Sequence, residues 1–142
     1  MLANVPRAQF FTGISILQVV TDPSHPVMAG MPDTADVVVS GSPVFTTLDG
    51  FQGSVLAKFP ADRSALRSGF LRGDQLIRGY AAAVDVRRDR GHLILFGFQP
   101  QWRGQPTGTF RTIFNSMFFA RDVSAQAAGR AGFWTPPATP GG

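Results

Sequence analysis

The chain has 142 residues, 44% of them hydrophobic, and its 13 basic and 9 acidic residues give a net charge of +4. That length and apolar content predict one hydrophobic core and one domain. Cysteine and glutamate are absent and His25 and His92 are the two histidines, which excludes thiol nucleophiles, disulfides, thiolate zinc sites and His–Glu metal motifs.

The basic residues are spread along the chain, apart from Arg87, Arg88 and Arg90 at a predicted turn. A nucleic-acid-binding surface usually gathers its bases in a stripe or patch. No apolar run reaches the roughly 18 residues of a membrane span, and residues 1–13 lack the basic and apolar regions of a signal peptide. We therefore expect neither nucleic acid nor membrane as a partner.

The first half of the chain predicts short strands separated by Pro and Gly breaks. Residues 35–40 are nearly all apolar, which predicts a strand covered on both faces. Asp49-Gly50 indicates a turn, because Gly tolerates positive φ. The predicted strands are 14–20, 35–40, 44–48 and 54–59.

The second half predicts a β-hairpin and one helix. Residues 63–80 contain three glycines and predict short helical turns. Residues 81–86 and 92–98 flank a short loop ending in Gly91 and predict the hairpin, with 92–98 as a central strand because it is almost continuously apolar.

The predicted helix covers residues 107–120. Its apolar residues follow the spacing of one buried helical face, and Thr107 or Thr109 can cap the first amides. Residues 123–142 are rich in Ala, Gly and Pro, which predicts a disordered tail after a single α/β segment over 1–122. The predicted core stripe is Phe110, Ile113, Phe114, Met117 and Phe118.

Three polar residues are weighed as catalytic candidates. His25 lies in a turn, His92 opens a strand, and Asp85 lies within a strand, where a carboxylate facing outward to an Arg is the ordinary interpretation. We interpret all three as structural, so no catalytic residue and no metal ligand is predicted. A hydrolase acting through His25 and an Asp is kept as a further hypothesis.

The loop that joins the last strand to the helix is the best candidate for a ligand site. It lies at the end of a strand and before a helix N-terminus, where open α/β sheets place ligands and where anions bind. The alternative is a hydrogen-bonded corner that locks the helix to the sheet. The candidate residues are Gln99, Gln101, Arg103, Gln105 and Thr107.

Residues 24–32 (SHPVMAGMP), 41–45 (GSPVF), 91–105 (GHLILFGFQPQWRGQ) and 108–110 (GTF), with Phe114-Asn115, carry a resemblance. Over roughly residues 13–119 the chain resembles the C-terminal region of large bacterial proteins of the zinc carboxypeptidase (carboxypeptidase A type) family. In those proteins a domain similar to class I glutamine amidotransferases follows the peptidase domain.

The resemblance implies a partial flavodoxin-like or glutamine-amidotransferase-like α/β sheet with a β-hairpin and one C-terminal amphipathic helix. The family's zinc ligands and catalytic glutamate match no position here. Gln99-Pro100-Gln101 stands where an amidotransferase has His-Pro-Glu, and an amide cannot serve as a base. No cofactor is implied, and the parent proteins look secreted or periplasmic.

The implied function is that of a non-catalytic accessory domain associated with a zinc carboxypeptidase-type metallopeptidase. If Met1 begins partway through the domain, upstream strands are missing and Phe10-Phe11 lacks a partner element. We then expect an exposed apolar edge, met by the parent's peptidase domain or by self-association. The alternative function is a stand-alone module that binds a polar or anionic ligand at the 99–109 loop.

Overall fold

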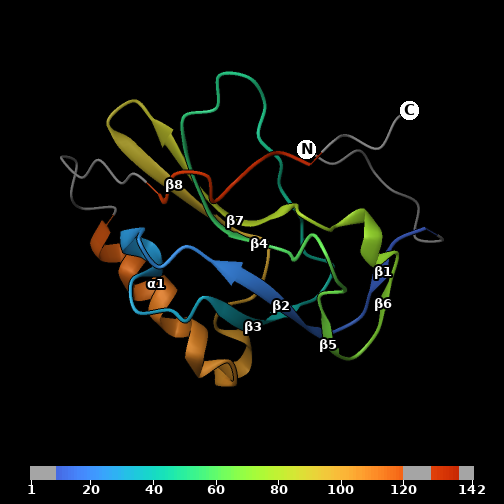
Figure 1. Ribbon diagram of the computed structural model, residues 1–142. Helices are drawn as coiled ribbons and strands as arrows, with labels where there is room; N and C mark the ends of the chain where they lie inside the picture. Colours follow the sequence, from blue (N-terminus) through green and yellow to red (C-terminus); the bar gives the residue numbers. More distant parts are fainter. Residues whose placement is uncertain (1–8, 120–128, 138–142) are drawn as a thin grey trace.

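The computed structural model describes residues 9–119 and 129–137 (Figure 1). Short strands dominate this part of the chain, and a single α-helix follows them. The elements are β1 (Phe11–Thr12), β2 (Ser15–Thr21), η1 (Pro26–Met28), β3 (Thr34–Val39), β4 (Gly53–Lys58), β5 (Leu66–Ser68), β6 (Leu71–Arg72), η2 (Asp74–Leu76), β7 (Ala81–Arg88), β8 (Gly91–Phe96), η3 (Trp102–Gly104) and α1 (Thr107–Phe119).

The main sheet has the order β3-β2-β4-β7-β8, with β5 also paired to β2. It is curled, and the chain leaving β8 returns to β3, where the Gln99 N–H donates to the Val38 carbonyl over 2.8 Å. The predicted α/β class, with its hairpin and C-terminal helix, is confirmed. All strand pairs between described residues are antiparallel, so this part of the chain does not form the parallel pairs of a complete flavodoxin-like sheet.

Strand β7 is the most buried strand of the sheet. Ala81 to Asp85 are all buried, and β7 pairs with both β4 and β8. The predicted central strand, 92–98, is instead the edge strand β8, and most of its residues are partly exposed. The small side chains of the alanines let neighbouring elements approach β7 closely. The length of the apolar run predicted β8 as the central strand, whereas the alanine-rich β7 occupies that position.

Three further sequence predictions differ from the structure. Strand β3 alternates between buried and exposed residues, so it is covered on one face and not on both. Residues 44–48 contribute a single bridge, from Phe45 to Ala81, rather than a strand. Within 63–80 the helical turn η2 is present, but β5 and β6 are short strands.

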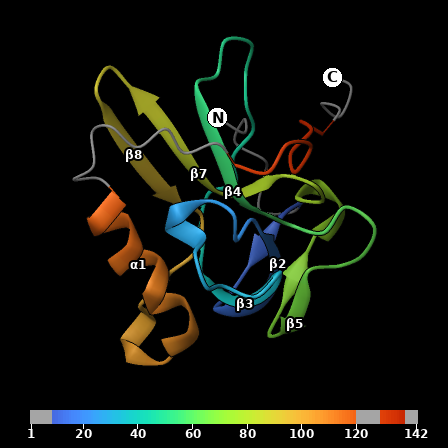
Figure 2. The ribbon, with the colours of Figure 1, turned by 60° about the vertical axis from the view of Figure 1, so that its left-hand side comes forward.

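Helix α1 is present at the predicted residues but buries a different face. Thr109, Thr112 and Phe119 are buried, whereas Phe114, Met117 and Phe118 are exposed, so the predicted core stripe is wrong at those three positions. Its other two members, Phe110 and Ile113, are partly buried. The buried side lies against the loop around η1 (Figure 2). The buried hydroxyl groups are satisfied elsewhere, since Thr112 Oγ1 donates to the Thr109 carbonyl of its own helix.

Side-chain hydrogen bonds hold α1 to the η1 loop. Asn115 Nδ2 donates to the carbonyls of Val27 and Ala29, each over 3.1 Å, and Arg111 donates to the Gly30 carbonyl over 2.5 Å. Thr109 Oγ1 donates to carbonyl oxygens of the preceding loop rather than capping an amide. The bonds from Asn115 join two of the sequence blocks that carry the family resemblance, 24–32 and Phe114-Asn115.

Residues 129–137 pack against the sheet on the side away from α1, as the red segment of Figure 1 shows. Phe133 is 5% exposed and joins a small apolar cluster with Val55 and Val84. Lys58 Nζ donates to the Phe133 carbonyl over 2.6 Å and lies 4.8 Å from the centre of its ring. The prediction of disorder is therefore wrong for 129–137. The Ala-, Gly- and Pro-rich composition suggested too little apolar surface to order this segment, but Phe133 and Trp134 supply it. The rest of the predicted tail, 123–128 and 138–142, lies outside the described residues.

The pair Phe10-Phe11 has partners within the chain. Phe10 packs against the main core, and the rings of Phe11 and Phe70 lie 6.2 Å apart where β1 pairs with β6. Both Phe11 and Phe70 remain about half exposed. Within the described ranges, no helix combines the length and apolar character needed to cross a membrane.

Candidate functional site: a carboxylate between two histidines

Asp85 lies at the centre of the main polar cluster inside the fold. It sits on β7, is 1% exposed, and lies 3.0 Å from His92 Nδ1 through each of its two carboxylate oxygens. In the register of the hairpin Asp85 faces Ile94 and His92 faces Arg87. Asp85 and His92 are therefore diagonal neighbours on one face of the sheet, within reach of each other's side chains.

His25 approaches the same carboxylate from the loop. It is the N-cap of η1 and fully buried, and its Nδ1 accepts a hydrogen bond from the Val27 N–H over 3.2 Å. Its Nε2 lies 3.3 Å from Asp85 Oδ2 but makes no well-aligned hydrogen bond. Because Nδ1 is an acceptor, the proton of a neutral His25 ring is on Nε2, facing the carboxylate.

Phe119, near the end of α1, packs against both imidazoles. Its ring centre lies 5.2 Å from that of His25 and 4.5 Å from that of His92. The cluster thus joins η1, β7, β8 and α1. We name His25, Asp85, His92 and Phe119 the Asp85 cluster.

This arrangement corrects one interpretation of the sequence. Asp85 does not face outward to an Arg, and Arg78 pairs with Asp74 instead. The two histidines are 67 positions apart, so spacing alone could not place them together. The available signal was an Asp within the apolar run AAAVDV, since a carboxylate with buried neighbours needs buried partners.

In chemical terms the cluster is a carboxylate that orients imidazole rings. A carboxylate bound to one ring nitrogen of a His fixes its tautomer and leaves the other nitrogen as an acceptor or a base. Across residues 9–119 and 129–137, no group of three His, Cys, Asp or Glu is arranged to hold a metal ion.

A second buried carboxylate, Asp22, lies beside the cluster. It is fully buried and accepts hydrogen bonds from the N–H and hydroxyl of Ser24 and, over 2.6 Å, from the Arg130 N–H. Its carbonyl accepts from the His25 N–H. Asp22 therefore ties the η1 loop to the returning segment 129–137.

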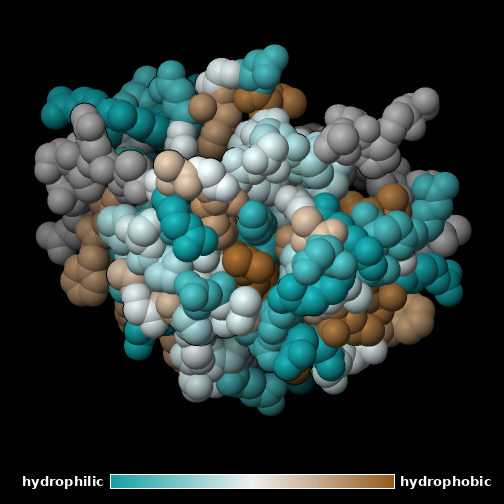
Figure 3. All heavy atoms as spheres, viewed as in Figure 1, coloured by the Kyte–Doolittle hydropathy of each residue, from teal (hydrophilic) through white to brown (hydrophobic). Residues whose placement is uncertain are grey.

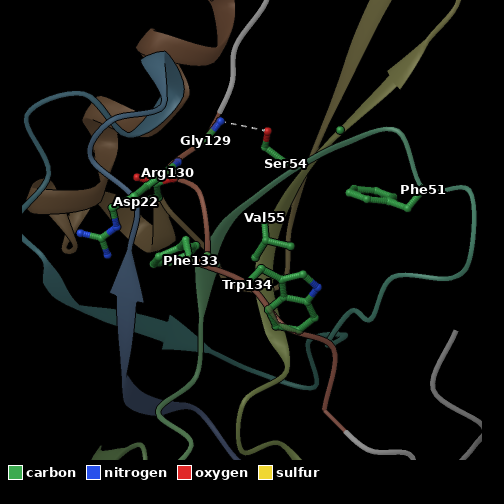
Figure 4. Close-up of a pocket in the computed structure, with 10 residues that line it drawn as sticks. Asp22, Phe51, Ser54, Val55, Gly129, Arg130, Phe133 and Trp134 are labelled. Carbon is green, nitrogen blue, oxygen red and sulfur yellow. Dashed lines mark hydrogen bonds between the residues drawn. The ribbon is translucent and has the colours of Figure 1, made fainter.

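Asp22 also lines a pocket of about 200 Å³ (Figure 4). Ser54, at one wall, is the cross-strand neighbour of Asp85, and its Oγ accepts from the Gly129 N–H over 3.4 Å. Figure 4 shows Phe51 on one side of the pocket, with Phe133 and Trp134 below it. Both aromatic and polar side chains line this pocket.

The predicted loop site is at the surface. Gln99 lies where the ends of β3 and β8 meet, and its Oε1 is buried with no hydrogen-bond partner among the described residues. Arg103 adopts φ +48° and lies over the Trp102 ring, 5.2 Å from its centre. The structure leaves the remaining candidates exposed, without bringing them to a common point: Gln101, Gln105 and Thr107.

Comparisons of the chain with models of protein families, with curated proteins and with solved structures find no match.

Proposed function

We propose that this chain is a non-catalytic accessory domain of a zinc carboxypeptidase-type metallopeptidase. In this role it binds the peptidase domain through α1 and takes no part in peptide hydrolysis. The observation that carries the proposal is the exposed face of α1, where Phe114, Met117 and Phe118 are 57%, 60% and 75% exposed. We name these three residues the α1 face.

The α1 face has the character of a binding surface. Large exposed apolar side chains that gather on one element mark interaction sites more often than scattered ones do. The three side chains of the α1 face are themselves apolar, as the centres of protein interfaces tend to be. Arg111, the one charged residue of the helix, donates to the Gly30 carbonyl and keeps its charge at the border of this face.

The family resemblance supports this use of the helix. Two of its sequence blocks, 24–32 and Phe114-Asn115, meet at the hydrogen bonds from Asn115 to the carbonyls of Val27 and Ala29. Those bonds fix which side of α1 is buried. Residues that carry the family resemblance thus hold α1 in the orientation that leaves the α1 face exposed.

Figure 3 shows the distribution of apolar surface on one side of the molecule. Apolar side chains also reach the surface around β1, β5 and β6, where Phe11, Ile14 and Phe70 are exposed. This second surface lies apart from the α1 face, and we assign the α1 face to the peptidase domain.

The test begins with the reading frame upstream of Met1. If it encodes a zinc-peptidase motif, that domain is purified and its binding to the chain is measured by titration calorimetry. We expect Phe118→Asp and Met117→Asp to weaken binding at least tenfold, since interface centres carry most of the binding energy. Leu48→Asp is the matched control, because Leu48 is 76% exposed on a separate loop.

Absence of binding by the unmodified chain, or equal weakening by the control, would refute the proposal. The sequence also predicts self-association as an alternative to binding the peptidase domain, and sedimentation of the chain alone tests for it. A dimer that Phe118→Asp dissociates would assign the α1 face to self-association instead.

The alternative is a module that binds a polar or anionic ligand at the 99–109 loop. Gln99 Oε1, a hydrogen-bond acceptor, is buried without a partner among the described residues, which favours a ligand group that donates. The guanidinium of Arg103 lies over the Trp102 ring and makes no ion pair among those residues, which favours an anionic group. Titration with inorganic phosphate tests it. Loss of phosphate binding in Arg103→Ala and Gln101→Ala, with folding retained, would favour the module, whereas loss of folding would favour a structural corner.

A further inference from the structure

The loop before β4 is fixed at both ends to β7 and forms the teal arch at the top of Figure 1. At one end the Phe45 N–H donates to the Ala81 carbonyl over 2.8 Å, and the Ala81 N–H donates to the Phe45 carbonyl over 2.9 Å. At the other end the Arg87 N–H donates to the Gln52 carbonyl over 2.9 Å. We name residues 45–52 the arch.

The middle of the arch is held by two further contacts. Leu48 to Phe51 form a turn in which the Phe51 N–H donates to the Leu48 carbonyl over 3.0 Å. Gly50 has φ +80° in this turn, a left-handed conformation that glycine adopts without strain. Trp134 Nε1 donates to Thr47 Oγ1 over 3.1 Å. The arch is therefore held in place before any ligand binds.

A cavity of about 340 Å³ lies between the arch and the β7–β8 hairpin. Its floor is formed by Val84, Val86 and Leu95, which share one face because Val84 and Val86 are two positions apart and Leu95 pairs with Val84. Phe45 and Phe51 line its walls. The volume falls within the roughly 300 to 1,000 Å³ of ligand pockets, and the lining suits an apolar group.

Asp49 supplies the one charge on the described lining of this cavity. It lies in the turn of the arch, is exposed, and has no ion-pair or hydrogen-bond partner among the described residues. The carboxylate attracts a cationic group and repels an anionic one. An apolar floor below a single carboxylate therefore favours a ligand that has an apolar body and a positive charge.

We propose that this cavity binds small hydrophobic amines. The apolar body lies on Val84, Val86 and Leu95, and the ammonium group pairs with Asp49. The cavity borders the second apolar cluster, on the face of the sheet that α1 leaves open. This inference involves no catalytic step, and it does not depend on binding of the α1 face to the peptidase domain.

The experiment titrates the ¹⁵N-labelled full chain at pH 7 and low ionic strength with 2-phenylethylamine, 2-phenylethanol and 3-phenylpropionate. The three probes share a phenyl group and differ in charge. We expect the amine to bind about threefold to fivefold more tightly than the alcohol, as is typical of an exposed charge pair, and the carboxylate to bind most weakly. The amide signals of the arch and of Val84 to Val86 should move.

Asp49→Asn should bring the amine and the alcohol to equal affinity without loss of alcohol binding. Asp62→Asn is the matched control, because it removes the same charge from a side chain that is 77% exposed and does not line the cavity. It should retain the preference for the amine. Retained alcohol binding also shows that each variant is folded.

Three results would overturn the proposal: no saturable binding of the amine by the unmodified chain, a preference for the amine that survives in Asp49→Asn, or signal changes confined to residues outside the cavity. The peptide Phe-Gly-Gly carries the same chemistry, an ammonium beside an apolar side chain. If it binds as tightly as 2-phenylethylamine, peptide N-termini are a source of the ligand; if it binds more weakly, the cavity selects free amines.

Discussion

At the scale of the residue, the conformation of Gly30 explains why glycine is required in the η1 loop. Gly30 has φ +75°, and a Cβ there would overlap the guanidinium of Arg111. The position thus combines a left-handed backbone with the close approach of α1.

Gly30→Ala should therefore lower the free energy of unfolding by more than about 1 kcal/mol. Gly50→Ala is the matched control, because Gly50 has φ +80° and a Cβ at that position would lie in open space among the described residues. Urea unfolding of both variants separates backbone strain from overlap with Arg111. Equal losses in the two variants would show that the overlap relaxes without cost.

A second residue-scale prediction concerns pH. The hydrogen bond from Arg78, whose guanidinium lies 2.8 Å from the Asp74 carboxylate, lowers the pKa of Asp74 below its ordinary value of 3.8. A lowered carboxyl pKa contributes stability above the pKa of the unfolded state, and that stability is lost as pH falls through the folded pKa.

Arg78→Gln should cost less than about 1 kcal/mol near pH 7, because both side chains are partly exposed and solvent screens the pair. The difference from the unmodified chain should shrink as the pH falls through the lowered pKa of Asp74, because protonation removes the charge that Arg78 binds, and it should also shrink in high salt. Urea unfolding at neutral and at acid pH measures it. A difference that persists at acid pH would show that Arg78 acts through packing.

At the scale of the element, α1 shows how a correct helix can carry an incorrect face. Its boundaries agree with the sequence to within one residue. Two different sets of positions in this helix recur at helical spacing, one aromatic and one formed by Thr109, Thr112, Ser116 and Phe119. Periodicity detects both sets, but it cannot decide which set packs against the rest of the fold.

The neighbours Phe118 and Phe119 test this assignment. Phe119→Ala should destabilise the chain by about 3 kcal/mol, because it removes a ring that is 5% exposed and packs on both histidines. Phe118→Ala should change stability by no more than about 0.5 kcal/mol, since Phe118 is 75% exposed. Thermal unfolding of the isolated chain distinguishes them, and a larger loss in Phe118→Ala would restore the predicted stripe.

At the scale of the whole molecule, residues 129–137 complete the fold. Phe133 covers Val55 and Val84 on the face of the sheet that α1 leaves open, and the Arg130 N–H satisfies the buried Asp22. The second apolar cluster thus depends on residues far along the chain from the strands it covers.

Phe133→Ala should lower the free energy of unfolding by about 3 kcal/mol, through lost burial and the cavity left between Val55 and Trp134. Pro136→Ala, at an exposed position of the same segment, is the control and should have little effect. Chemical unfolding measures both. If Phe133→Ala matched the control, residues 129–137 would contribute nothing to the stability of the sheet.

The sequence by itself determined the α/β class, the hairpin, the extent of α1 and the positions of β2, β3 and β4. These features depend on local spacing and on Gly and Pro breaks, which act over a few residues. Tertiary structure alone decided that β8 is an edge strand, which face of α1 is buried, and that 129–137 is packed. It also decided that His25 and His92 share Asp85, because that contact joins a loop, a hairpin and a helix whose relative positions no local pattern specifies.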